Sequence, residues 1–310
     1  MATSAQKLTT IRGVAAALAS AALAVFALAL PAGADARATG EPTLMVHGLD
    51  PIGRASADCR SWQPMADAFE RWGHDGPSLT LAYYARDVNC SLSIDGHGNH
   101  RAHHGAGGHD RRGHSHNADA SIRHLGHHLA WFIHDRYARR RQRVDLVGNS
   151  MGGLVIRYAL HKVGQGAADF PPRLLVDDVV TLGTPHDGAL LAHLCPYALE
   201  CREMRPGSQL LDELRRFARD PQASGGTDWT TIGSYLDRIV SERSAVQMDA
   251  RRRVIYRPSM KIGHSDYRRD TSSYLNAAVD QRDRGQPWRR RGNAPHVVRW
   301  VYDALTGDSG

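Results

Sequence analysis

The chain has 310 residues, of which 42% are hydrophobic and 23% charged, and its formal net charge is +7 at pH 7. The basic excess does not indicate a nucleic-acid partner, because the Arg runs at 139–141, 251–253 and 289–291 are separated and lack interleaved aromatic residues. We interpret it as a solvated surface, with attraction to an anionic envelope or lipid surface as the alternative.

Residues 1–36 have the pattern of a secretory signal peptide. Lys7 and Arg12 give a positive start, and the uncharged run from Val14 to Leu30 is followed by small residues that fit cleavage near residues 34–38. The apolar run is near the lower limit for a membrane span, so an uncleaved anchor is the alternative. We expect a single exported α/β domain over residues 37–310, a length that one core can support.

Strand-like and helix-like runs alternate along this domain, which predicts an α/β fold. The fold we expect is a compact, mostly parallel sheet of about six strands, with helices on both faces and no large cap domain. The expected strands are Thr43–His47, Leu79–Ala85, Val144–Gly148, Asp178–Gly183, Trp229–Gly233 and Arg253–Arg257. The expected helices are Trp62–Trp72, Ala120–Arg139, Met151–Val163, Ser208–Arg219 and Pro295–Leu305.

A Gly/His-rich insertion at 91–118 interrupts this alternation. Imidazole is a good ligand for transition metals, but this spacing in a Gly-rich loop has no fixed geometry and few carboxylates accompany it. We expect a mobile loop beside the active site rather than a metal site. Its histidines are His97, His100, His103, His104, His109, His114 and His116.

Four cysteines lie in the exported part, and an even count in an oxidising compartment favours disulfides. Three pairings are open, and we prefer Cys59–Cys90 with Cys195–Cys201, because each pair flanks one continuous loop region. The alternative is two pairs of buried free thiols. No C-x-x-C spacing occurs, so zinc is not expected.

The most informative segment is Gly148-Asn149-Ser150-Met151-Gly152-Gly153, between an apolar strand-like run and an amphipathic helical run. G-x-S-x-G at such a turn forces the serine into strained backbone geometry and exposes its hydroxyl above the sheet edge. The amide of Met151 then points to where an oxyanion would form. The alternative is a plain glycine turn.

A second oxyanion donor is expected from the first strand, which ends at His47-Gly48-Leu49. The glycine lets the backbone turn inward, which places the Leu49 N–H to pair with that of Met151. An ordinary strand end is the alternative.

The acid and base should follow Ser150 in the chain. Asp237 lies just past a predicted strand end, where catalytic residues gather in open α/β sheets. Its competitors fit less well: Asp228 precedes that strand, and Asp212 and Asp249 fall on helix-like runs.

Only two histidines remain after this acid, and they are His264 and His296. His296 starts the C-terminal helical run, whereas His264 lies in a loop. We therefore predict a triad of Ser150, His264 and Asp237.

These motifs resemble the secreted bacterial lipases and esterases of the α/β-hydrolase superfamily, especially the actinobacterial group. The resemblance spans about residues 42–305 and adds the string Thr181-Leu182-Gly183-Thr184-Pro185-His186, a strand end that lines the cleft in such relatives. It implies carboxylic-ester hydrolysis on an acyl-ester or lipid substrate, with no cofactor, and a cleft-lining His186. Relatives usually carry His where this chain has Asn149. This difference puts in question how the turn around Ser150, the nucleophile elbow, is supported.

The resemblance leaves three hypotheses open. The leading hypothesis is a secreted carboxylic-ester hydrolase, a triacylglycerol lipase or carboxylesterase, acting through an acyl-enzyme. An acyltransferase or a polyester depolymerase would use the same residues. A catalytically silent envelope or binding protein is the alternative of another class. We expect a monomer with transient contact to a lipid surface and no nucleic-acid partner.

Overall fold

The computed structural model describes residues 40–49, 56–94, 120–195, 197–222 and 225–307. Residues 38–310 group as one compact unit. The predicted leader, its cleavage site, and the predicted loop with its seven histidines lie outside the described residues, apart from positions 91–94 of the insertion. Among the helices that the structure describes, none is long and apolar enough to span a bilayer.

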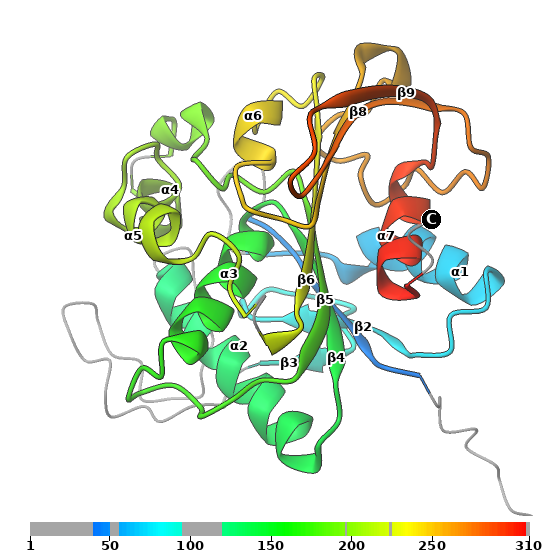
Figure 1. Cartoon of the computed structure of the whole chain (residues 1–310). Helices are drawn as coiled ribbons and strands as arrows, with labels where there is room; N and C mark the ends of the chain where they lie inside the picture. Colours follow the sequence, from blue (N-terminus) through cyan, green and yellow to red (C-terminus); the bar gives the residue numbers. More distant parts are fainter. Residues whose placement is uncertain (1–39, 50–55, 95–119, 196, 223–224, 308–310) are drawn as a thin grey trace, which may run out of the picture. The chain divides into compact units, whose positions relative to one another are not determined.

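A nine-stranded mixed sheet forms the centre of this unit (Figure 1). Its spatial order is β3-β2-β1-β4-β5-β6-β7-β8-β9. The seven strands from β3 to β7 run parallel, and β8 and β9 continue the sheet as an antiparallel pair. The strands are β1 (Thr43–Val46), β2 (Ser78–Ala82), β3 (Leu92–Ser93), β4 (Val144–Asn149), β5 (Val176–Leu182), β6 (Asp228–Ser234), β7 (Arg252–Tyr256), β8 (Ala277–Asp283) and β9 (Arg289–Ala294).

The expected count of about six strands is wrong, although each of the six predicted runs overlaps a strand. The three missed strands carry only a short or weak apolar pattern. The two-residue β3 lies inside the stretch predicted as a structureless insertion, and β8 and β9 are rich in charged residues. A polar, largely exposed edge strand is how many sheets avoid pairing with other chains, so its sequence reads as loop.

Helices cover both faces of the sheet, because side chains alternate along each strand. On β1, Leu44 and Val46 join one core cluster with residues of α2, α3 and α5, whereas Met45 joins a second cluster with residues of α1 and α7. The helices are α1 (Gln63–Arg71), α2 (Ile122–Arg136), α3 (Met151–Gly164), α4 (Leu199–Glu203), α5 (Gln209–Phe217), α6 (Glu242–Ala245) and α7 (Val297–Leu305).

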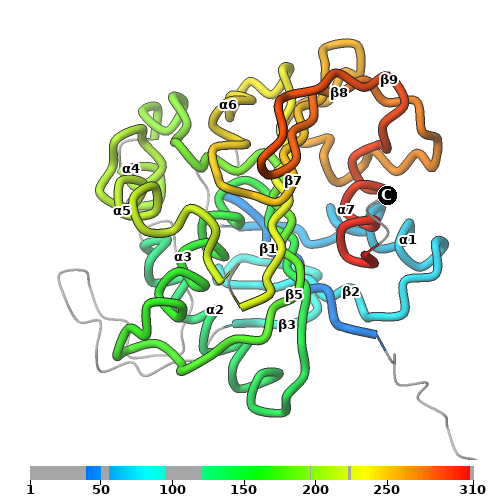
Figure 2. The backbone as a smooth tube through the Cα atoms, in the orientation of Figure 1, coloured from blue at the N-terminus to red at the C-terminus, as the bar shows by residue number. Residues whose placement is uncertain are grey.

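The end of the described chain returns to its beginning, where α7 lies beside α1 (Figure 2). The rings of Phe69 and Tyr302 meet edge to face with centroids 6.0 Å apart, and the Tyr302 hydroxyl donates to the Trp72 carbonyl over 2.6 Å. This contact closes the second core cluster.

Two disulfides fasten loop segments beside the sheet. Cys59 and Cys90 are joined with their Cα atoms 4.9 Å apart, which ties the 3-10 helix η1 (Cys59–Trp62) to the segment after β2. Cys195 and Cys201 are joined with a Cα separation of 5.9 Å. These are the two preferred pairings. Between β5 and β6 the described residues form η3 (Leu190–His193), α4 and α5.

Parallel strands bring their carboxyl ends to one edge of a sheet. Ser150 directly follows β4, Asp237 lies three residues past β6, and His264 lies in the segment between β7 and β8. The backbone topology therefore gathers residues that are far apart in sequence at this edge.

Candidate active site

Ser150 stands at a strained turn between β4 and α3. Its backbone angles are φ 56° and ψ −129°, a region that costs a non-glycine residue on the order of 1–3 kcal/mol. Ser150 is the N-cap residue of α3, but its side chain does not cap the helix. The hydroxyl is therefore available for another partner.

Glycines on both sides make this turn sterically accessible. A Cβ at position 148 would lie 2.6 Å from the Gly153 Cα, and a Cβ at position 152 would lie 2.3 Å from the Val46 carbonyl oxygen. Such distances are far below van der Waals contact, so side chains at these positions would push α3 away from β1 and β4. The glycines expected from the motif are thus required by packing.

Asn149 braces the turn from the side of β5. Its Nδ2 donates to the Leu182 carbonyl over 3.1 Å, and the Ser150 N–H donates to the same carbonyl over 2.8 Å. Asn149 is 5% exposed, so this bond is shielded from water. An asparagine can therefore support the elbow at the position where relatives usually carry histidine.

The structure brings the three predicted side chains into one hydrogen-bonded relay. Ser150 Oγ lies 3.0 Å from His264 Nε2, and His264 Nδ1 lies 2.8 Å from Asp237 Oδ2. In the tautomer that suits both bonds, Nδ1–H donates to the carboxylate and Nε2 accepts from the hydroxyl. The arrangement can pass the serine proton to the imidazole while the carboxylate balances the resulting charge.

Asp237 is buried and held by four donors. Its Oδ1 accepts from the N–H groups of Ile239 and Val240, at 2.9 and 3.0 Å, and its Oδ2 accepts from the Tyr267 hydroxyl at 3.1 Å as well as from His264. Burial and the neighbouring Asp237 charge raise the pKa of Tyr267 well above its usual value, so this phenol stays a donor. Every bond therefore fixes the carboxylate as an acceptor facing His264.

Gly183, at the end of β5, allows the acid and the histidine to sit this close to the sheet. It has φ +54°, and a Cβ there would lie 2.6 Å from a ring carbon of Tyr267, 2.9 Å from Asp237 Oδ2 and 3.3 Å from His264 Nδ1. Both the backbone angle and the space exclude a side chain.

The predicted oxyanion donors lie on either side of Ser150. Met151 is the first residue of α3, and the first N–H groups of a helix have no partner within it. On the other side, a Cβ on Gly48 would lie 2.6 Å from Ser150 Cβ and 3.2 Å from its Oγ. The segment that carries the Leu49 N–H therefore passes directly against the serine.

The predicted cleft-lining role of His186 does not fit its surroundings, because this residue is only 1% exposed. Its Nε2 lies 3.0 Å from Thr181 Oγ1, and its Nδ1 lies 3.3 Å from Arg157 Nη1. Burial, with the nearby Arg157 charge, holds the pKa of His186 well below its usual range. His186 is a neutral residue of the protein interior.

The competing acids and the second histidine have other partners. Asp228 begins β6 and pairs with Arg251, while Asp212 pairs with Arg215. Asp249 lies in a loop rather than a helix, with Arg219 and Arg253 at 2.9 and 3.0 Å. His296 is the N-cap residue of α7 and is bound to Asp270 Oδ1 over 2.6 Å.

Three residues of the site do not follow from the sequence: Tyr267 and Gly183, which adjoin Asp237 and His264, and Asp87, which binds His47. Gly183 belongs to the string at a predicted strand end, which does not distinguish it from its neighbours, and Tyr267 follows His264 by three residues with no motif to mark it. Asp87, which binds the His47 side chain, follows β2 without a local pattern. Among the described residues, no group of three His, Cys, Asp or Glu side chains is arranged to hold a metal ion.

No protein-family model matches this sequence, and no curated protein matches it. Solved structures that are similar to it include a lipase of Bacillus licheniformis, BlEst2 in its propeptide form, with 20% identity and a TM-score of 0.41 over 66% of this chain and 43% of that one. Phospholipase PlaB from Legionella pneumophila has 13% identity and a TM-score of 0.44 over 66% of this chain and 45% of its own. Aspergillus fumigatus lipase B has 17% identity and a TM-score of 0.41 over 68% and 41%.

This chain thus spans less than half the length of PlaB, of lipase B and of the propeptide form of BlEst2, and 79% of the mature form of BlEst2. Identities and TM-scores this low do not establish an activity for this chain.

Proposed function

We propose that the protein is a secreted serine carboxylic-ester hydrolase, a lipase or esterase, with Ser150 as nucleophile, His264 as general base and acid, and Asp237 as the group that orients His264. The observation that carries the proposal is the relay of 3.0 and 2.8 Å bonds that ends on a serine in a strained turn. A serine hydroxyl is a weak nucleophile unless a positioned base removes its proton.

In the first half-reaction, Ser150 Oγ attacks the carbonyl carbon of the ester while its proton moves to His264 Nε2. The tetrahedral intermediate then collapses, the bond to the leaving alcohol breaks, and His264 returns the proton to that alcohol oxygen. The product is an acyl-enzyme on Ser150. In the second half, His264 takes a proton from water, the resulting hydroxide attacks the acyl carbon, and Ser150 leaves with the proton.

We assign stabilisation of both tetrahedral oxyanions to the backbone N–H groups of Leu49 and Met151. Met151 adds the positive end of the α3 dipole, which favours negative charge at this position. Each donor of this kind contributes on the order of 10²–10³-fold in rate when it is already in place before reaction.

An acyl-ester or lipid substrate is supported by apolar side chains exposed on the two segments that carry the acid and the histidine, after β6 and after β7. Leu236, which precedes the acid, is 40% exposed, and Tyr274 and Leu275, in the segment after His264, are 74% and 60% exposed. Such side chains suit an acyl chain or transient contact with a lipid surface. The two disulfides support export, since disulfides persist in oxidising compartments.

The test is hydrolysis of a p-nitrophenyl ester series, from short to long acyl chains, by the oxidised protein and by Ser150→Ala. We expect hydrolysis by the wild type alone, with the preferred chain length dividing esterase from lipase. A matched control is Ser272→Ala, a serine of the exposed segment after His264 whose hydroxyl only accepts a local backbone bond. A folded wild type that hydrolyses no member of the series would refute the proposal.

A further inference from the structure

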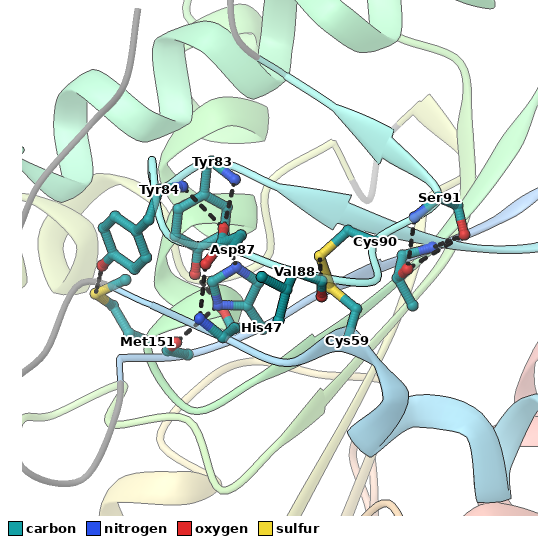
Figure 3. Close-up of polar contacts among 12 residues, drawn as sticks. His47, Cys59, Tyr83, Tyr84, Asp87, Val88, Cys90, Ser91 and Met151 are labelled. Carbon is teal, nitrogen blue, oxygen red and sulfur yellow. Dashed lines mark hydrogen bonds and ion pairs between the residues drawn. A yellow bond between two sulfur atoms is a disulfide. The ribbon is translucent and has the colours of Figure 1, made fainter.

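His47, directly after β1, is buried beside the segment Gly48–Leu49, which carries one of the two proposed oxyanion donors, and it takes no part in the relay. It is 2% exposed, and both ring nitrogens are engaged: Nδ1 lies 2.8 Å from the Gly48 carbonyl oxygen and Nε2 lies 2.9 Å from Asp87 Oδ2. The Tyr83 ring stacks on the imidazole with centroids 4.0 Å apart (Figure 3).

Both partners of His47 are acceptors. A backbone carbonyl can only accept, so Nδ1 must carry a proton. Asp87 already accepts the N–H groups of Tyr83, Tyr84 and Ala57, and a lone pair on Nε2 would face its carboxylate unless that nitrogen also carries a proton. The hydrogen bonds are satisfied together when His47 is an imidazolium paired with an ionised Asp87.

The surroundings of the Asp87 carboxylate favour its ionised form. Burial alone would raise the pKa of Asp87, but the hydrogen bond and charge of His47, with the N–H groups of Tyr84 and Tyr83, hold it below its usual value. Both side chains of the pair are almost fully shielded, so removing one partner would leave the other charge buried without compensation.

The bond to Gly48 determines the direction of the next amide. The Gly48 carbonyl and the Leu49 N–H belong to one peptide unit, and the described chain has no cis peptide bond. In a trans peptide the C=O and N–H point in opposite directions. When His47 holds the carbonyl on its own side, the Leu49 N–H is directed the other way, and the same unit passes against Ser150.

We propose that the buried His47–Asp87 ion pair is a positioning device that orients the Leu49 N–H toward the oxyanion; this rests on the proposed function of the site. The imidazolium also polarises the peptide through its carbonyl, which strengthens the N–H as a donor. His47 acts through the backbone and touches neither substrate nor Ser150.

The Cys59–Cys90 disulfide holds Asp87 in place. The disulfide joins the segment that contains Ala57 and Cys59 to the segment that contains Val88 and Cys90 (Figure 3). Beside it, the Cys59 N–H donates to the Val88 carbonyl over 3.0 Å, and the Val88 N–H donates to the Ala57 carbonyl over 2.9 Å. Asp87 directly precedes Val88, so these bonds fix its backbone. Tyr83 completes the support, because its hydroxyl donates to the His47 carbonyl while its ring stacks on the imidazole.

The first measurement is steady-state ester hydrolysis by His47→Gln and Asp87→Asn, both under oxidising conditions. A glutamine carries its donors on one nitrogen and cannot serve both acceptors, and an asparagine amide would confront the donors that surround Asp87. We expect kcat to fall about 10–100-fold with KM within about twofold, because only the transition state needs the oriented amide. Phosphonylation of Ser150 by an organophosphonate should slow in parallel.

The matched control is His74→Gln. His74 is a half-buried histidine between α1 and β2 that is bonded to Thr43 Oγ1 at the other end of β1, so its loss tests the general effect of removing a histidine that contacts this strand. We expect kcat unchanged in this variant. Equal losses in His47→Gln and His74→Gln, or a rise in KM that accounts for the whole loss in His47→Gln, would overturn the proposal.

A second measurement does not depend on activity. In wild-type protein labelled with ¹⁵N-histidine, the signal that disappears in His47→Gln should show protons on both ring nitrogens. A ring with one proton would overturn the proposal whatever the activity. If the wild type hydrolyses no ester yet shows the doubly protonated ring, the proposed function fails while the ion pair stands.

Discussion

Replacement of Gly183 by alanine tests how closely the sheet approaches the acid–histidine pair. The new methyl group would lie 2.6 Å from the Tyr267 ring, 2.9 Å from Asp237 Oδ2 and 3.3 Å from His264 Nδ1. Tyr267 is fully buried and Asp237 is held by four donors, so neither can give way without breaking a bond of the relay.

Two costs follow from this geometry. The backbone at φ +54° costs alanine roughly 1–2 kcal/mol relative to glycine, which lowers the free energy of unfolding. Contacts below 3 Å must also relax by about 0.5–1 Å, and a misplacement of about 1 Å can cost on the order of 10²-fold in rate. We expect kcat to fall about 10–100-fold, equivalent to about 1.4–2.7 kcal/mol in the activation barrier.

The matched control is Gly166→Ala. Gly166 follows α3 with φ +65° and has no atom within 4 Å of an added Cβ, so this variant carries the backbone cost without the steric one. Hydrolysis kinetics and urea unfolding of both variants separate the two effects. We expect both to lose stability and only Gly183→Ala to lose kcat. If Gly183→Ala hydrolyses esters at the wild-type rate, the argument from close approach is refuted.

Two further substitutions test the surroundings of Asp237 and of Asp145. Tyr267→Phe removes one of four donors to Asp237, so kcat should fall about 3–10-fold while KM is retained, a change of about 1 kcal/mol as for one hydrogen bond; an unchanged kcat would show that the phenol does not hold the acid. Burial and the neighbouring Asp178 raise the pKa of Asp145 to about 8. The Asp145 carboxyl of the folded protein therefore keeps its proton as the pH rises above 3.8, the ordinary pKa of an aspartate, whereas the unfolded chain loses it. Stability should therefore fall between about pH 4 and 8, by up to about 1.4 kcal/mol per pH unit, and Asp145→Asn should gain stability over the wild type as pH rises; an equal difference in urea midpoints at pH 5 and pH 8 would contradict this.

The parts of the site that sequence could predict are those encoded by local pattern. The elbow is a contiguous motif whose glycines and strained serine follow from its own sterics, and Ser150 could be read directly. Asp237 and His264 were found from chain order and position after a strand, because parallel topology sends strand ends to one edge. The structure places these three side chains in contact, and their catalytic roles stay a prediction.

The parts that sequence could not predict depend on distant contacts. Asp87 binds His47 across 40 residues, and Tyr267 reaches back 30 residues to Asp237. No spacing rule connects such pairs, because the tertiary fold alone brings them together. His186 shows the converse: the string that contains it is readable, but its burial is decided by the packing of Arg157 from α3.

The same limit explains the strand count. Apolar runs identify strands that are buried on both faces, and the six predicted strands form the parallel part of the sheet apart from the two-residue β3. The antiparallel strands β8 and β9 are mostly polar, and β9 forms the exposed edge of the sheet. Hydrophobic periodicity is therefore too weak there to predict strands.

The most direct test of the account is the site of covalent labelling by a fluorophosphonate, mapped by mass spectrometry on the folded, oxidised protein. The account predicts one adduct, on Ser150, with loss of ester hydrolysis in proportion to labelling, and no adduct on Ser150→Ala. Labelling at another residue, or ester hydrolysis that persists in Ser150→Ala, would contradict the central claim that Ser150 is the nucleophile.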